Sequence, residues 1–194
     1  ELRGLTQQMS YQASHDALTG LVNRREFERR LGEVIEIARA GRQGHVVCYL
    51  DLDRFKAVND TSGHLAGDNM LREVAALIRE AVRDSDTVAR IGGDEFGVLL
   101  VGCPLEKARQ IADDISRAIA EYRFVWKDRI FSVGVSIGIV ELTGESNSLE
   151  EVMSAADSAC YVAKKQPDIR VHVYSAHDEV VARSRGEIQW LQRL

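Results

Sequence analysis

The stretch TVARIGGDEFGVLLV, residues 87–101, decides the fold. Residues 87–91 and 96–101 are rich in the side chains that favour strands. Between them stands Gly92-Gly93-Asp94-Glu95, which is typical of a tight turn. We therefore expect a β-hairpin whose turn carries two adjacent acids.

The segments on either side of this hairpin complete a β-α-β-β-α-β order. Residues 46–50 form a short continuous apolar run, as in a strand buried on both faces, and residues 65–82 carry a helical apolar stripe. Residues 105–122 are again helical, and residues 131–139 alternate apolar with small side chains, as a strand does. This order predicts an α+β, ferredoxin-like fold: one mostly antiparallel sheet with helices on one face.

Further helices are expected outside this core. Residues 1–14 predict a polar helix with a narrow apolar stripe that suits pairing with a partner helix. A second helix starts at Asn23, with Glu26 completing a near capping box. A third is capped by Ser148, ends near Lys165 and precedes a short strand at residues 171–174. The division we expect is a linker helix at 1–14, a domain at 15–175 and a linker helix at 176–194.

The composition is that of an ordinary globular protein. The 194 residues include 25 Lys and Arg against 30 Asp and Glu, a net charge of −5, which argues against non-specific nucleic-acid binding. Cys48, Cys103 and Cys160 are far apart and fit a reducing cytoplasm, not a disulfide or zinc pattern. No run approaches the ~18 apolar residues of a membrane span. The chain begins with Glu1, so we expect it to be cut from something longer.

Acids follow the first strand and occupy the hairpin turn. The first strand of a βαββαβ sheet lies beside the hairpin, so Asp51, Asp94 and Glu95 are expected to converge, with Asp53 two residues after Asp51. Converging carboxylates repel one another unless a cation lies between them, and hard oxygen ligands favour Mg²⁺ or Mn²⁺. Such a site suits phosphoryl or nucleotidyl transfer. The alternative is that each acid is a solvated turn residue.

Polar residues also mark the starts of the next two helices. Asp53-Arg54-Phe55-Lys56 opens a short segment whose backbone N–H groups, with Lys56, could hold phosphate. His64 and Asp68 are four residues apart and share one helix face. An Asp carboxylate accepts hydrogen bonds from guanine N1–H and N2–H₂, and the Asn59 amide can donate to its O6 or N7. Capping, turn formation and an ordinary surface lysine are the alternatives.

Taken together, four motifs resemble the GGDEF family of diguanylate cyclases, in order and with the family's spacing. They cover about residues 15 to 175, and they are DALTGLVNRR (16–25), DLDRFK (51–56), NDTSGH (59–64) with Gly67-Asp68, and RIGGDEF (90–96). The resemblance implies a core like that of nucleotide cyclases and the polymerase palm, with extra N- and C-terminal helices.

The resemblance also implies an activity: two GTP molecules condense to cyclic di-GMP with release of two pyrophosphates. Asp51, the Leu52 carbonyl, Asp94 and Glu95 would form the metal site, and Asp94 would be the base for the attacking 3′-hydroxyl, with Glu95 beside it as a catalytic residue. The residues that would meet the substrate are Asn59 and Asp68 at the guanine, His64 against the substrate, and Phe55, Lys56 and Lys164 at the phosphates.

An inhibitory product site and one departure follow from the same comparison of motifs. Arg83 and Asp86 have the family's spacing from Gly92 for that site, and the alternative is an exposed Arg–Asp pair. After Lys164 the family usually has Gly-Arg-Asn, whereas this chain has Pro167-Asp168-Ile169. The phosphate-contacting arginine is therefore absent from its expected place, and Arg170 stands two places later.

Two functional hypotheses emerge. The leading one is an active diguanylate cyclase with GTP as substrate, cyclic di-GMP as product and inhibitor, a homodimeric assembly, upstream sensory domains and no nucleic-acid partner. The tail RSRGEIQW, residues 183–190, resembles the connector to a following EAL phosphodiesterase domain. The second hypothesis is accordingly a catalytically weak module that binds GTP or cyclic di-GMP and regulates that domain. A structural coiled-coil adaptor is a distant third.

Overall fold

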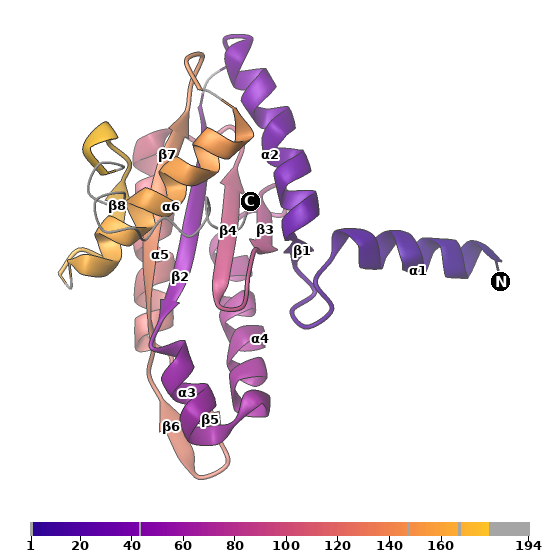
Figure 1. The fold of residues 1–194 in the computed structure, drawn as a ribbon, viewed down its shortest axis with the longest axis vertical. Coiled ribbons are helices and arrows are strands. Elements are labelled where there is room, and N and C mark those ends of the chain that lie inside the picture. The colour runs from indigo at the N-terminus through magenta and orange to yellow at the C-terminus, as the bar shows by residue number, and fades with distance from the viewer. Residues whose placement is uncertain (1, 43, 147, 167, 179–194) are drawn as a thin grey trace.

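Six strands of the computed structural model form one sheet in the order β1-β3-β4-β2-β7-β8 (Figure 1). The structure describes residues 2–42, 44–146, 148–166 and 168–178. The central pairs β3–β4, β4–β2 and β2–β7 are antiparallel, whereas the outer pairs β1–β3 and β7–β8 are parallel. The strands are β1 (Val22–Asn23), β2 (His45–Asp53), β3 (Thr87–Arg90), β4 (Glu95–Leu100), β7 (Gly134–Leu142) and β8 (Val171–Val173).

The predicted βαββαβ order is confirmed by β2, α4, β3, β4, α5 and β7. Within the described residues the helices are α1 (Leu2–Ser14), α2 (Arg24–Arg39), α3 (Phe55–Ser62), α4 (His64–Ala81), α5 (Leu105–Glu121) and α6 (Leu149–Lys165). Both predicted N-caps are present. The Asn23 side chain accepts a hydrogen bond from the Glu26 N–H at 3.0 Å, and the Ser148 hydroxyl accepts one from the Glu151 N–H at 3.3 Å.

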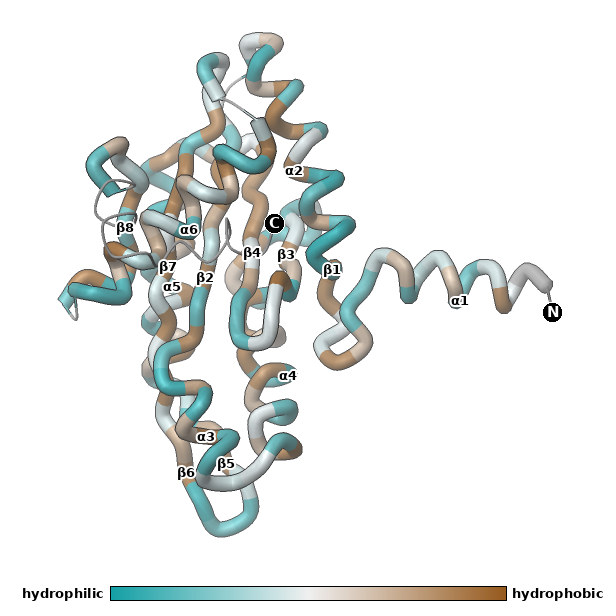
Figure 2. Tube along the Cα trace, viewed as in Figure 1, coloured by the Kyte–Doolittle hydropathy of each residue, from teal (hydrophilic) through white to brown (hydrophobic). Residues whose placement is uncertain are grey.

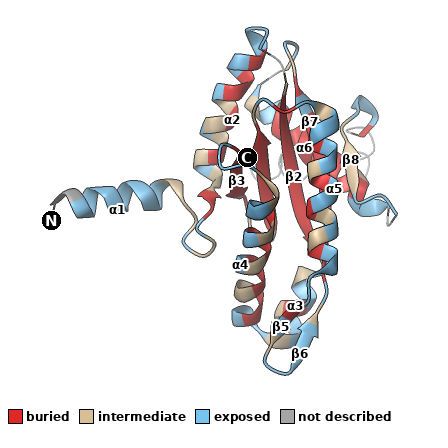
Figure 3. Cartoon of the chain, turned by 180° about the vertical axis from the view of Figure 1, so that it is seen from behind, coloured by how far each residue is buried: buried red, intermediate tan, exposed pale blue. Residues whose placement is uncertain are grey.

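Helices cover both faces of the sheet, so the expectation of helices on one face was wrong. Alternate residues of β2 point to opposite layers: Leu50 packs with α4 and α5, and Tyr49 packs with α2 and α6. Figure 1 shows α2 and α6 in front of the sheet, and Figure 3 shows α4 and α5 from behind. The expectation counted only the two crossover helices of the core, whereas α2 and α6 lie outside it and bury the second face.

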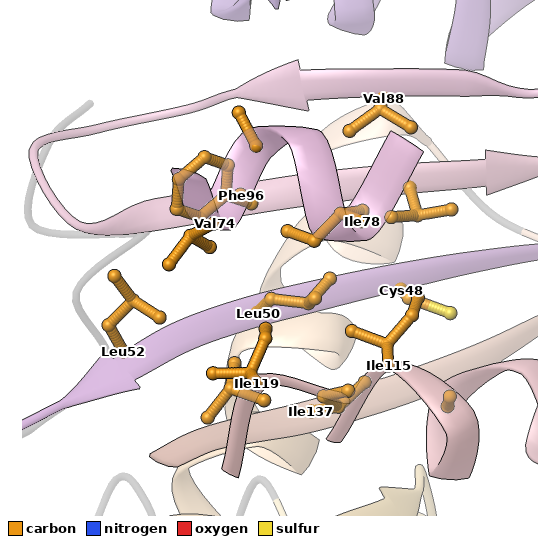
Figure 4. Packing of buried hydrophobic residues seen from close by; sticks show 14 of the residues in the cluster. Cys48, Leu50, Leu52, Val74, Ile78, Val88, Phe96, Ile115, Ile119 and Ile137 are labelled. Carbon is orange, nitrogen blue, oxygen red and sulfur yellow. The ribbon is translucent and has the colours of Figure 1, made fainter. Parts of the chain in front are cut away.

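The layer against α4 and α5 is the larger of the two apolar clusters. Figure 4 shows Leu50 of β2, Phe96 of β4 and Ile137 of β7 facing Ile78 of α4 and Ile119 of α5. All five side chains are buried, and burying one such side chain contributes roughly 1.5–3 kcal/mol. Figure 2 shows the same pattern along the chain, with apolar residues on the central strands and polar ones at the turns.

The small residues of β7 let α6 approach the sheet. Gly138 pairs with Tyr49 of β2, and a Cβ atom at Gly138 would lie 2.3 Å from the Cys160 backbone nitrogen and 2.5 Å from the Ala156 carbonyl oxygen. The backbones of β7 and α6 are therefore in direct contact. This contact fixes α6, and with it Lys164, relative to β2.

The strand predicted at residues 131–139 begins later and is preceded by a separate hairpin. Phe131 belongs to β6 (Arg129–Phe131), which pairs with β5 (Phe124–Trp126) in a second, two-stranded sheet. The turn uses Lys127 at φ +53°. The alternating pattern begins at Phe131, the last residue of β6, and continues into β7, so the sequence did not show the break between them.

Helix α1 projects from the domain (Figure 1). Leu5 and Met9 of its apolar stripe are exposed, as is Tyr11. Of the helices that the structure describes, none combines the length and apolarity needed to cross a membrane. Residues 176–178 form a helical turn, and the predicted tail helix and connector beyond residue 178 lie outside the described residues.

Candidate active site

The acids of two motifs meet where β2 ends and β4 begins. The acids Asp51 and Asp53 were expected to follow the first strand, but they lie within β2. The strand continues beyond the apolar run and ends at Asp53. Asp51 is paired in register with Glu95, the first residue of β4. Asp94 is held beside them because its carbonyl accepts a hydrogen bond from the Leu52 N–H at 3.1 Å. The structure thus brings Asp51, Asp94 and Glu95 to one end of the sheet.

Asp51 sits in a buried and charged environment. Only 12% of its side chain is exposed, and the Lys164 ammonium donates a hydrogen bond to its Oδ2 at 2.9 Å. Burial raises the pKa of Asp51 to about 6, Lys164 opposes this rise, and Asp94 and Asp53 add to it. For Lys164, burial lowers the pKa, but the carboxylates of Asp51 and Asp53 outweigh burial and leave it raised.

The donor chemistry of this site fits a hard divalent ion. Within the described part of the chain, no three His, Cys, Asp or Glu side chains already form a metal-binding cluster. Two of the carboxylates, those of Asp51 and Glu95, nevertheless belong to register partners on adjacent strands, and the Lys164 ammonium already lies at an Asp51 oxygen. Carboxylate and carbonyl oxygens are the ligands that Mg²⁺ and Mn²⁺ prefer. The residues present therefore suit such an ion once the hydrogen bond from Lys164 to Asp51 is broken.

The raised pKa of Asp51 leads to a prediction for stability without a divalent ion. Because the pKa rises from 3.8 to about 6 on folding, the stabilising contribution is fully present below pH 3.8 and is lost as the pH rises through about 6. Asp51→Asn removes this titration. We expect the variant to gain up to about 3 kcal/mol on the wild type between about pH 4 and pH 7. Urea unfolding of both proteins across this range measures the difference, and a pH-independent difference would contradict the assignment.

A second cation–carboxylate pair lies next to the first. The Arg170 guanidinium forms an ion pair with the Oδ2 of Asp53, and the Ser136 hydroxyl donates to both Asp53 oxygens at 3.1 and 3.2 Å. Ser136 is also the register partner of Asp51. Arg170, which the motif comparison placed two residues late, thus reaches the same end of β2 as Lys164.

The expected guanine-binding residues lie on α3 and α4. Asn59 is half-buried, and its Oδ1 is a buried atom with no hydrogen-bond partner among the described residues. A Cβ atom at Gly67 would lie 1.9 Å from that oxygen, so glycine is required for Asn59 to occupy this position. Asp68 is half-buried one residue further along α4, and His64 is exposed at the start of that helix.

The start of α3 has the character of an anion site. Arg54, the N-cap residue, adopts a left-handed conformation at φ +65°, and its side chain makes no capping hydrogen bond. The Ala57 N–H donates to the Arg54 carbonyl at 3.2 Å, which leaves the N–H groups of Phe55 and Lys56 as those that an anion can reach. Phe55 is half-buried at this start, and Lys56 is exposed.

Sequence reasoning missed a contact that supports the Gly-Gly turn. Arg90 donates from Nε to the carbonyls of Gly92 and Gly93 at 3.1 and 3.2 Å, and its Nη1 pairs with Asp16 at 3.3 Å. Asp16 stands two residues after α1 and also accepts hydrogen bonds from Thr19. The signal was present, because Asp16 and Arg90 each open a motif, but their pairing across 74 residues was not visible.

Arg83 and Asp86 are paired at the other end of the hairpin. Asp86 has no exposed side-chain surface and accepts from the Arg83 guanidinium at 3.0 and 3.2 Å, whereas 55% of the Arg83 side chain is exposed. Arg83 also donates to the Val101 carbonyl at 2.6 Å, just past the end of β4. Since β4 has six residues, this pair lies about 20 Å from Asp94.

These observations define a class of protein: an α+β domain on a βαββαβ sheet, with acids at one sheet end and polar helix starts in the connection that follows β2. The chain belongs to the family described as diguanylate cyclase, GGDEF domain, which matches residues 13–170. Cyclases of this family depend on a divalent metal ion, and GTP and cyclic di-GMP are their typical ligands.

Known proteins are similar over nearly the whole chain. The probable diguanylate cyclase DgcE of Escherichia coli (strain K12) is 47% identical over 98% of this chain and 18% of its own length. The cyclic di-GMP phosphodiesterase PdeB of Shewanella oneidensis is 34% identical over 100% of this chain and 23% of its own. The chain thus spans about a fifth of these relatives.

A solved structure supports the same assignment. The coiled coil and GGDEF domain of DgcB from Caulobacter crescentus, in complex with cyclic di-GMP, superposes with a TM-score of 0.82 at 28% identity. The match covers 89% of this chain and 91% of that one.

Proposed function

We propose that this domain condenses two GTP molecules to cyclic di-GMP and releases two pyrophosphates. The observation that carries the proposal is the register of Asp51 against Glu95, with Asp94 beside them and Lys164 on Asp51. In each half-reaction a 3′-oxygen bonds to the α-phosphorus of the other GTP, and the bond from that phosphorus to pyrophosphate breaks. This chemistry needs carboxylates for a metal and a base, and cations for the departing phosphates.

The roles of the residues follow from their placement. A bound Mg²⁺ or Mn²⁺ supplies polarisation of the α-phosphate, and Asp51, the Leu52 carbonyl, Asp94 and Glu95 are the residues we assign to hold it. Asp94 accepts the proton of the attacking 3′-hydroxyl. Lys164 transfers from Asp51 to the phosphates when nucleotide binds, while Phe55 and Lys56 present the start of α3 to them.

Asn59 and Asp68 are assigned to the guanine, which predicts strong selection against ATP. Asp68 accepts from guanine N1–H and N2–H₂, and adenine offers no such donors, so the carboxylate would stay unpaired. An unpaired polar group costs about 1–3 kcal/mol, so GTP should bind at least about fivefold more tightly than ATP. Equilibrium competition between GTP and ATP analogues with a methylene bridge between the α- and β-phosphates, with Mg²⁺ present, measures this preference without turnover. Asp68→Ala should lose it and the exposed Asp60→Ala should keep it, and displacement of GTP by ATP at equal concentration would contradict the assignment.

We assign the active assembly as a homodimer. Cyclic di-GMP is two-fold symmetric and each domain presents one GTP, so two domains face each other across a two-fold axis. The exposed residues Leu5 and Met9 on the projecting helix α1 suit a helix pair that brings the domains together. His64, exposed at the start of α4, is assigned to lie against the substrate.

Arg83 and Asp86 are assigned to product inhibition, with Asp86 holding the guanidinium that meets the product. Product bound there would favour an arrangement in which the half-sites do not face each other. Arg83→Ala should keep the initial rate and remove the slowing of the reaction as cyclic di-GMP accumulates. Progress curves at saturating GTP compare the wild type with Arg83→Ala and with Arg109→Ala, an exposed control on α5. If all three curves superimpose, the pair has only a structural role.

A second candidate is a module that binds these nucleotides and regulates an attached EAL domain within a cytoplasmic or membrane-anchored protein. Two observations favour it. The chain lacks the expected arginine at residue 168, and one similar protein is named a cyclic di-GMP phosphodiesterase. The two candidates differ in whether the purified domain forms product from GTP.

A further inference from the structure

Arg170 occupies a position that the surrounding backbone is shaped to receive. Its carbonyl accepts a hydrogen bond from the Ile137 N–H at 2.8 Å, which fixes the chain just before β8. Its side chain then crosses Gly134 of β7, where a Cβ atom would lie 3.2 Å from Nη1. A larger residue at position 134 would press on the guanidinium. Glycine at this position therefore leaves room for Arg170 beside the end of β2.

The guanidinium is only partly used by its present partner. Among the described residues, the Arg170 guanidinium bonds one side chain, the Asp53 carboxylate, and it does so through Nη1. About 43% of the Arg170 side chain remains exposed. Asp53 does not depend on Arg170 alone, because the Ser136 hydroxyl donates to both of its oxygens. If Arg170 dissociates, the Asp53 carboxylate therefore keeps a hydrogen-bond donor, the Ser136 hydroxyl.

The neighbouring groups at this end of the sheet are the ones a triphosphate needs. Asp51 and Asp53 are alternate residues of β2, so they lie about 7 Å apart on one face. One carries Lys164 and the other carries Arg170. The chain then turns through Arg54 in the left-handed conformation into the uncapped start of α3. Two cations and the N–H groups of Phe55 and Lys56 thus adjoin the acids assigned to the metal.

We infer that Arg170 is a phosphate-binding residue. When a nucleoside triphosphate binds, the Arg170 guanidinium dissociates from Asp53 and pairs with the terminal phosphates. This inference rests on the proposed function. A planar guanidinium matches phosphate oxygens with two parallel hydrogen bonds, and a triphosphate offers it more charge than the single carboxylate of Asp53. Arg170 thereby supplies, from the position just before β8, the arginine that residues 165–169 lack.

The alternative is a purely structural ion pair that pins β8 to β2. The two roles predict different effects of removing Arg170 on the affinities for a triphosphate and for a monophosphate. A phosphate ligand affects binding of a triphosphate and not of a monophosphate, whereas a structural pair affects both or neither. They also differ for Asp53, because removing this carboxylate frees a phosphate ligand but breaks a structural pair.

The test is calorimetric binding with Mg²⁺ to the full chain, using two probes. One probe is a GTP analogue with a methylene bridge between the α- and β-phosphates, and the other is GMP. Arg170→Ala should weaken the analogue about tenfold or more and GMP less than about threefold. Arg170→Lys, which keeps the charge, should fall between. Arg117→Ala is the matched control, because Arg117 is an exposed arginine of α5 that also pairs with an aspartate, Asp114.

Asp53→Asn separates the two accounts further, and thermal unfolding checks that each variant is folded. The phosphate role predicts that Asp53→Asn binds the analogue as tightly as the wild type or more tightly. The inference is overturned if Arg170→Ala leaves the analogue unaffected or weakens both probes equally. It is also overturned if Asp53→Asn loses as much affinity for the analogue as Arg170→Ala. A wild-type chain that binds neither probe would instead contradict the proposed function itself.

Discussion

Asp94→Asn should lower the rate of cyclic di-GMP formation at least ~10²-fold, and Asp51→Asn should do the same. Each substitution removes a carboxylate charge assigned to the divalent ion at the α-phosphate, where negative charge develops in the transition state. Asp94 is half-buried in the turn that Arg90 braces, and Asp51 is buried on the neighbouring strand. The asparagine side chain has nearly the same shape, so the fold and the guanine contacts should persist. Initial rates at saturating GTP and Mg²⁺ measure the effect.

The control for this pair is Asp113→Asn, which neutralises an exposed acid of α5 on the layer that does not hold Lys164. Its rate should match that of the wild type. Binding of the methylene-bridged GTP analogue reports whether the nucleotide site survives in each variant. A variant at Asp94 or Asp51 that keeps more than about a tenth of the wild-type rate would remove that residue from the metal and base assignment.

Gly138→Ala should destabilise the domain by about 1–3 kcal/mol or more, because the added methyl group meets backbone and not flexible side chains. The nearest atoms would be the Cys160 nitrogen at 2.3 Å and the Ala156 oxygen at 2.5 Å, so α6 must shift as a unit. Urea unfolding measures the loss directly. In a domain of this size each kcal/mol lowers Tm by about 2–4 °C.

The consequence for activity follows from the position of Lys164 in the last turn of α6. If α6 moves off β7, Lys164 moves away from Asp51, and activity should fall together with stability. Gly32→Ala is the matched control, since Gly32 lies within α2 with nothing within 4 Å of the added atom. That substitution should stabilise by about 0.5–1 kcal/mol through helix propensity. A Gly138→Ala protein as stable as Gly32→Ala would contradict the close packing of β7 on α6.

Local patterns predicted the elements that depend on local physics. The apolar run before Asp51, the stripe of α4 and the Asn23 and Ser148 caps each act over a few residues, and the structure has them within one to three residues of the predicted bounds. The convergence of Asp51 and Glu95 was also predictable, because the strand order of a βαββαβ sheet places the first strand beside the hairpin.

What the sequence could not predict depends on contacts between distant residues. The alternation that runs through β7 already begins at Phe131 of β6, so it did not separate the β5–β6 hairpin from β7. The second helical layer depends on Gly138 and its neighbours allowing α6 to approach, and glycine in a strand pattern does not say what comes close to it. The contacts of Arg170 with Asp53 and of Arg90 with Asp16 join residues 117 and 74 positions apart. No local pattern reports such pairs.

The proposed function requires that this domain itself makes the 3′–5′ phosphodiester bonds between two guanine nucleotides at the acids of β2 and β4. The most direct measurement is to incubate the purified chain with GTP and Mg²⁺ and to quantify cyclic di-GMP by chromatography and pyrophosphate in the same samples. The account predicts two pyrophosphates for each cyclic di-GMP, no product from ATP and none above background from Asp94→Asn. GTP that is bound but recovered unchanged, at concentrations where the chain is dimeric, would contradict the account and leave the domain a nucleotide-binding module.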